Sequence, residues 1–307
     1  MVATTLSFFL IRASPVNPFT ALLDNPRLSG EVRERLIAEY GQDRPVLEQF
    51  GRYVSRVYSG NLGFSFTHWR PVHTVVAERL PATLILMGLA LAASFATGIA
   101  IGIAQARRAG AAADKVLGGI TLFFFSLPDF WLALVLLYVF GYQLNLVPTG
   151  NVLGIDFPYL TWGEQLVLRV QQLVLPVLTL TLLTAALIAR HQRGAVLDVA
   201  RREFVRTARA KGASERLVLY RHILRNALLP VVTLLGLAVP ALLTGAVFVE
   251  RIFGINGMGA LTVEAIRNGD AELVSSIVLL VAVMVSLGNL MADVLAALID
   301  PRLREAA

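Results

Sequence analysis

The feature that most constrains this chain is a series of apolar segments, each long enough to cross a lipid bilayer. A run of about 20 apolar residues spans the hydrocarbon core. Irregular backbone cannot face lipid, so such runs must be helical. Five runs stand out, of which the third is shorter but uncharged: residues 82–104, 116–142, 173–189, 227–249 and 273–298. They predict an all-α, polytopic membrane protein with five clear spans.

Composition agrees with a membrane location. The 307 residues are 56% hydrophobic and 16% charged, whereas a soluble domain carries about 25% charged residues. The alternative is a soluble bundle of buried helices, which would need five helices without a polar face. We therefore interpret residues 80–299 as a membrane-embedded core.

The N-terminal residues do not make a complete span. Residues 1–11 are apolar, but Arg12, Ser14 and Pro15 interrupt the run. Eleven residues rise only about 16 Å in a helix, roughly half a bilayer. We interpret residues 1–13 as the outer part of a first helix whose beginning is absent from this sequence. A stub lying on the membrane surface is the alternative.

Basic residues give the predicted orientation, because cytoplasmic loops are enriched in Lys and Arg. Residues 105–115 hold three basic residues and residues 190–225 hold ten. Residues 143–172 hold one, and residues 250–272 hold two. The strongly basic loops and the C-terminal tail, residues 300–307, are therefore predicted to be cytoplasmic.

Residues 14–79 are predicted to form an extracytoplasmic loop, because long segments cross the membrane largely regardless of their charge. Apolar residues recur at helical spacing from residue 47 to residue 58, after Pro45 at an early helix position. Gly60 and Gly63 then break the helix. We expect a small cap packed on the outer membrane face rather than a ligand site.

The cytoplasmic segment 201–226 is predicted to contain two helices, at about residues 203–211 and 215–225. Gly212 suits the left-handed position that ends a helix, and Ser214 is a good cap for the next one. Phe204, Ala208 and Lys211 would share one face, and the small side chains of Ala208 and Ala210 would let a partner backbone come close. The alternative is a basic helix held on anionic lipid.

Four motifs resemble a known family. They are an outer-loop signature, a cytoplasmic coupling loop, a segment before the last helix and a C-terminal pattern, at residues 60–65, 206–212, 245–259 and 289–302. Together, over nearly the whole chain, they resemble the membrane permease subunit of ABC importers of the oligopeptide, dipeptide and nickel type. Arg206 stands where the general coupling-loop pattern has Glu, and the family's full first helix is missing.

The resemblance implies a type I ABC importer permease bundle in the bacterial inner membrane, working by alternating access. It implies a sister permease subunit, two cytoplasmic ATPase subunits and an extracytoplasmic substrate-binding protein as partners. The family handles peptides, nickel, haem-like and glutathione-like solutes, and among these we expect short peptides as the substrate. The residues expected to couple to the ATPase are Glu203, Arg206, Thr207, Ala208, Arg209, Lys211, Gly212 and Arg216. Ala208 and Gly212 match the family pattern most clearly.

Other chemistry finds little support in the sequence. The chain has no G-x-x-x-x-G-K-[ST] loop, so ATP would be bound by partner subunits and no cofactor is expected in this chain. It has no cysteine, and its four histidines show no metal-ligand spacing. No catalytic residue or metal site is predicted. The net charge of +6 reflects membrane topology rather than nucleic-acid binding.

The roles of three polar residues within the spans stay open. Asp129 lies near the middle of one apolar run, where an acid usually faces a bundle interior or a wet cavity. It would line the pathway or pair with a neighbouring helix. Asn289 and Asp293 lie near the inner end of the last span, where a structural role is favoured. An intramembrane enzyme would need paired acids at catalytic spacing, and a lipid-binding scaffold or receptor is the other alternative function.

Overall fold

The computed structural model describes residues 5, 8, 9, 44–149 and 159–299. Helices make up most of this part of the chain. Four of its helices are long and apolar enough to cross a membrane, and a bent pair would make a fifth span. This agrees with the five predicted spans. The expected partial first helix and the C-terminal tail lie almost wholly outside the described residues.

The predicted outer helix is confirmed as α4 (Val46–Tyr58), which starts directly after Pro45. Its Tyr53 is buried. Gly60 and Gly63 follow it, each with a positive φ of about 80° that glycine adopts without strain. Two short strands that the sequence did not predict come next, β1 (Phe64–Ser65) and β2 (Arg70–Pro71), and they pair antiparallel.

Two long helices form the centre of the bundle, α5 (Val72–Arg107) and α8 (Trp162–Ala200). Glycine lets their backbones come close. A Cβ atom on Gly98 would lie 2.7 Å from the Cβ of Ile188, and one on Gly102 would lie 2.6 Å from the carbonyl oxygen of Ala189. Both helices extend beyond the predicted apolar runs, because more polar residues continue each helix at its ends.

The predicted single span over residues 116–142 is broken. It consists of α6 (Ala112–Ser126), α7 (Asp129–Leu136) and the π-helical η1 (Leu137–Gln143), with a bend of 103° between the first part and the rest. Leu127, before Pro128, takes an extended conformation with ψ 138°. Proline lacks an N–H and disfavours helical conformation in the residue before it, so the helix ends there.

The second half of the chain begins with the basic segment that is predicted to be cytoplasmic. After α8 come α9 (Glu203–Ala210), α10 (Glu215–Leu217), the π-helical η3 (Val218–Ile223) and α11 (Leu224–Ala227). The predicted pair of helices is thus confirmed, with a π-helical stretch in the second.

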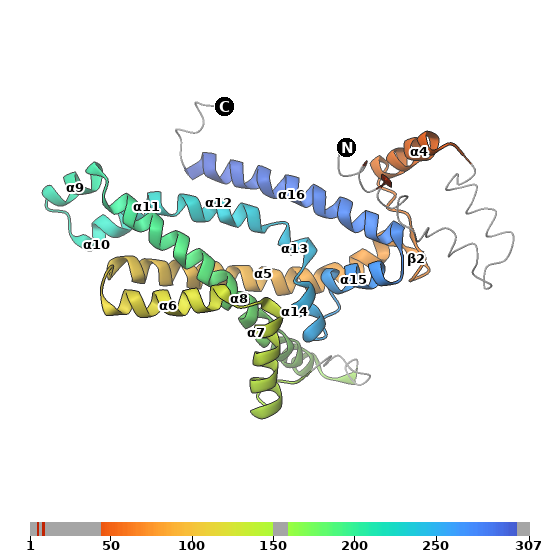
Figure 1. The fold of residues 1–307 in the computed structure, drawn as a ribbon, viewed down its shortest axis with the longest axis horizontal. Coiled ribbons are helices and arrows are strands. Elements are labelled where there is room, and N and C mark those ends of the chain that lie inside the picture. The colour runs from red at the N-terminus through yellow and green to blue at the C-terminus, as the bar shows by residue number, and fades with distance from the viewer. Residues whose placement is uncertain (1–4, 6–7, 10–43, 150–158, 300–307) are drawn as a thin grey trace.

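The remaining helices return across the membrane and end the described chain. They are α12 (Leu229–Ala238), α13 (Ala241–Thr244), α14 (Val247–Ile252), α15 (Met258–Arg267) and α16 (Ala271–Ile299). Figure 1 shows α9 and α10 at one end of the molecule, and α4, β2 and α15 towards the other. The basic segment and the outer cap therefore lie at opposite ends of the bundle, as the predicted orientation requires.

Candidate functional site

The candidate site is the coupling segment, residues 201–226, and α9 is its most prominent element. The helix is attached to the bundle through Val205 and Ala208, which are both buried. They belong to an apolar cluster formed by the inner ends of α5 and α8 together with η3 and α11. The cluster joins α9 to four other helical elements.

The structure corrects one expectation for Ala208. Its side chain was predicted to let a partner backbone come close, but it packs inside this chain's own apolar cluster. Phe204, expected on the same face, is instead 41% exposed. Val205 occupies the buried place, because the packed stripe of this short helix runs through residues 205 and 208.

The turn between the two helices is as predicted. Gly212 has a φ of +81°, in the left-handed region, and the Ala213 N–H donates to the Ala208 carbonyl at 3.2 Å. Such a bond is typical of glycine-terminated helices. The hydroxyl of Ser214 accepts from the Leu217 N–H at 3.4 Å and caps the next helix. The turn therefore fixes the angle between α9 and α10.

Several charged residues of the segment pair with one another. The Arg209 guanidinium donates to both oxygens of Glu215, at 2.8 and 3.3 Å, and so bridges the Gly212 turn. Arg206 donates to Glu203 at 2.9 Å within α9.

Two other predicted cations of the segment remain available. Lys211 and Arg216 are exposed, and neither forms an ion pair with a residue that the structure describes. Thr207, also exposed, donates to the Glu203 carbonyl at 3.0 Å. Among the predicted coupling residues, the cations without an ion-pair partner in the described part of the chain are therefore Lys211 and Arg216.

A cleft of about 660 Å³ lies behind this surface. It is lined by the inner ends of α5 and α8 on one side and by α9, α10 and η3 on the other. Its charged lining residues are Arg107, Arg209, Glu215 and Arg216. The coupling segment is thus attached to the bundle through its apolar cluster, and a cleft lies between the segment and the inner ends of α5 and α8.

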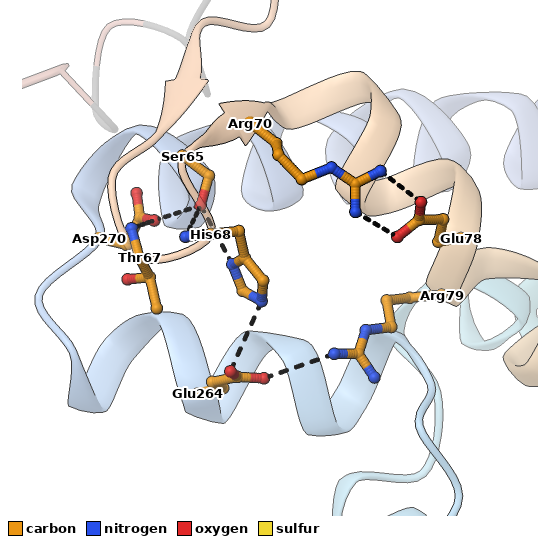
Figure 2. A network of polar contacts seen from close by, with 8 residues as sticks. All are labelled: Ser65, Thr67, His68, Arg70, Glu78, Arg79, Glu264 and Asp270. Carbon is orange, nitrogen blue, oxygen red and sulfur yellow. Dashed lines mark hydrogen bonds and ion pairs between the residues drawn. The ribbon is translucent and has the colours of Figure 1, made fainter. Parts of the chain in front are cut away.

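A polar network that the sequence did not predict lies at the outer end (Figure 2). The buried Asp270 accepts from the Ser65 hydroxyl at 2.6 Å and from the Thr67 N–H at 3.0 Å. His68 contacts Ser65 at 3.1 Å and Glu264 at 3.5 Å. These contacts attach the β1–β2 hairpin to α15 and to the turn before α16.

Two arginines complete the network in Figure 2. Arg79 lies 4.0 Å from Glu264, and Arg70 pairs with Glu78. Hydrogen bonding to the Glu78 carboxylate raises the pKa of Arg70. The charges of Arg70 and Arg79 are therefore balanced by partners within the chain.

Glu250 is a second feature that the sequence indicated only as part of a motif. It is fully buried, and its carboxylate accepts from the Thr83 hydroxyl and from the Ala260 N–H, each at 2.9 Å. A Cβ atom on Gly245 would lie 2.1 Å from Glu250 Oε1, and one on Gly257 would lie 2.6 Å from its Oε2. The carboxylate therefore holds the segment before α15 against α5.

Two of the three polar span residues have described side chains, and these two lie on different helices. Asp129 is the first residue of α7, directly after the bend, where it is half-buried and its side chain accepts from the Phe130 N–H at 2.7 Å. Asn289 is exposed on α16, and the side chain of Asp293 lies outside the described residues. Among the described residues, no cluster of three or more His, Cys, Asp or Glu side chains suits a metal ion.

Comparison with known proteins covers nearly the whole chain. A sequence model of the family "binding-protein-dependent transport system inner membrane component" matches residues 98–305. The oligopeptide transport system permease protein of Bacillus subtilis is 35% identical over 98% of this chain and 93% of its own length. The dipeptide transport system permease protein of Escherichia coli K12 is 34% identical over 98% of this chain and 94% of its own length.

A solved structure has a similar fold. It belongs to a methionine ABC transporter in an inward-facing conformation, and the two chains superpose with a TM-score of 0.56. The match covers 74% of this chain and 97% of the other, at 18% sequence identity. At this identity the likeness concerns the fold alone.

Proposed function

This chain belongs to the family of binding-protein-dependent transport system inner membrane components, and from this we propose that it is the permease subunit of an ATP-driven importer of short peptides. Peptide specificity is supported by its relatives, which are permease proteins of oligopeptide and dipeptide transport systems. A lipid-binding scaffold is not favoured, since the relatives are transport permeases and the match covers almost their full length.

The energy for transport would come from separate ATPase subunits, because the sequence contains no Walker-type phosphate loop. Two ATPases and a sister permease would complete the membrane complex, with a substrate-binding protein outside. No cofactor would be bound by this chain. The C-terminus and the coupling segment would lie on the cytoplasmic side, where the Lys and Arg excess places them.

The observation that carries this mechanism is the way α9 is seated. Its buried face joins it to the inner ends of α5 and α8 and to η3, and η3 continues through α11 into α12. A displacement of α9 by a moving ATPase would therefore move three membrane helices together. Rigid movement of packed elements between two arrangements is a recognised form of switching.

The surface offered to the ATPase would consist of exposed side chains rather than Ala208. Lys211 and Arg216 carry charges unmatched within the described residues. Reversing both charges, Lys211→Glu with Arg216→Glu, should reduce co-purification of the ATPase subunits roughly tenfold or more. The new carboxylates would repel the acidic groups of the ATPase with which the two cations would pair. A pull-down from detergent-solubilised membranes measures this directly.

A matched control reverses two charges on the outer side. Arg251 and Arg267 are exposed there and form no ion pair within the described residues. Arg251→Glu with Arg267→Glu should leave the ATPase bound. Equal co-purification of the two double variants would contradict docking at the coupling segment.

Peptide specificity is tested by uptake. Membrane vesicles that contain the whole transporter and its binding protein should accumulate a labelled dipeptide when ATP is supplied. Unlabelled tripeptide should compete with the dipeptide, whereas free methionine should not. Competition by methionine without competition by peptide would assign the transporter to amino acids instead.

A further inference from the structure

A second cavity, distinct from the coupling segment, lies beside the inner half of the bundle. This inner groove has a volume of about 390 Å³ and is formed by α5, α6 and α8. Its polar end is lined by Gln105, Lys115, Arg190 and Arg193, and its apolar end by Leu122 and Phe125. The polar end lies at the cytoplasmic ends of the three helices in the predicted orientation.

The polar end carries an excess of positive charge. Asp114 is buried and accepts two bonds from the Arg193 guanidinium, both at 2.8 Å, so these two charges balance. Lys115 and Arg190 are exposed and form no ion pair with any described residue. Two unmatched cations therefore border the groove.

The wall of the groove also holds an unused acceptor. Gln105 is only 2% exposed, and its Oε1 atom has no hydrogen-bond partner among the described residues. A buried polar atom without a partner costs free energy, so a ligand that donates a hydrogen bond would be favoured there. The groove thus presents two cations, and the unpaired Gln105 carbonyl lies buried in its wall.

Two unmatched cations suit an anionic ligand, and the apolar end of the groove indicates which kind of anion it is. Leu122 and Phe125 are 58% and 48% exposed, and Phe125 lies ten residues after Lys115 along α6. Ten residues of helix rise about 15 Å, which carries the groove from the membrane surface into the hydrocarbon. A free phosphate would use only the polar end, whereas a phospholipid would use both.

We propose that the inner groove binds an anionic glycerophospholipid of the cytoplasmic leaflet. Lys115 and Arg190 contact its phosphate, a headgroup hydroxyl donates to Gln105, and an acyl chain lies along Leu122 and Phe125. Basic pockets between membrane helices on the cytoplasmic side suit such headgroups. The inference depends on the orientation of the chain in the membrane and does not depend on what it transports.

Native mass spectrometry of the full-length chain, purified in mild detergent, tests the proposal. Titration with dioleoylphosphatidylglycerol should show one preferentially bound lipid, and dioleoylphosphatidylcholine should bind more weakly. Lys115→Ala with Arg190→Ala should weaken binding of the anionic lipid roughly 30-fold. Arg221→Ala with Arg225→Ala removes the same charge from two exposed cytoplasmic residues outside the groove and should leave binding unchanged.

A second variant distinguishes a specific loss of lipid recognition in the groove from a general loss of folding. Gln105→Leu keeps both cations and should still bind lipid, but it should lose the preference for dioleoylphosphatidylglycerol over dioleoylphosphatidic acid, whose headgroup has no glycerol hydroxyl. Equal retention of lipid by the two double-alanine variants would overturn the proposal. Displacement of the lipid by inorganic phosphate would make the groove a simple anion site, and displacement by a dipeptide would assign it to the substrate path.

Discussion

The packing of α9 against the bundle depends on the small side chain of Ala208. It is buried among apolar residues of α8, η3 and α11, whereas Ala210, two positions later on the same helix, is exposed. Ala208→Asp would place a carboxylate in this apolar cluster, and burying an unpaired charge is strongly unfavourable. We expect the chain to insert normally but α9 to leave its seat, so that ATP hydrolysis continues while uptake is lost.

The matched control for this prediction is Ala210→Asp, which adds the same side chain to the same helix. Parallel measurement of ATPase activity and peptide uptake in reconstituted vesicles should show much greater uncoupling for Ala208→Asp. An equal loss of uptake in both variants would mean that contact with a partner, rather than seating on this chain, decides coupling.

At the scale of single residues, the sequence predicted local backbone conformation better than the direction in which side chains point. Gly212 was identified correctly because a left-handed helix end depends on the residue itself. The direction of Ala208 was misjudged because two apolar stripes are available on an eight-residue helix, through Phe204 or through Val205. The role of Glu250 stayed hidden, since its partner Thr83 lies 167 residues away.

At the scale of elements, the break between α6 and α7 depends on Pro128. Restoring an N–H with Pro128→Ala would also free Leu127 to become helical. We expect the 103° bend to open and to vary more between molecules. The chain has no cysteine, so spin labels at Leu122→Cys and Leu134→Cys, both exposed positions, would report a longer and broader distance.

Pro176→Ala provides the comparison for this bend. Pro176 lies inside α8, which continues through it without interruption, so its replacement should leave the label distance between α6 and α7 unchanged. If Pro128→Ala and the unsubstituted chain gave the same distance distribution, packing around the bend rather than proline would hold it.

Prolines also show what a sequence leaves undecided about elements. Pro81 and Pro176 both lie inside continuous helices, α5 and α8, whereas Pro128 separates two helices. A proline weakens a helix wherever it occurs, and tertiary packing then decides whether the helix continues. Apolar length was therefore enough to place the spans, but it could not show that one of them is bent.

At the scale of the whole molecule, the pairing of helices could not be predicted. The α12 and α16 helices pack so closely that a Cβ atom on Gly236 would lie 2.2 Å from the Cβ of Ala292. Hydropathy identifies each span separately and carries no information on which spans touch. The orientation, in contrast, was predicted from charge alone, and the structure places the basic segment and the outer cap at opposite ends of the bundle (Figure 1).

Orientation is the property on which both the coupling segment and the inner groove depend, and the cysteine-free sequence makes it directly testable. Lys211 and Asn268 are exposed in the coupling segment and at the end of α15, on opposite sides of the predicted membrane. A membrane-impermeant maleimide added to intact cells, with the outer membrane permeabilised where there is one, should label Asn268→Cys but not Lys211→Cys. Inverted vesicles should give the reverse, because only then does the reagent reach the cytoplasmic face. Labelling of Lys211→Cys from outside would place the basic segment where no cytoplasmic ATPase could reach it, and would contradict the proposed mechanism at its first step.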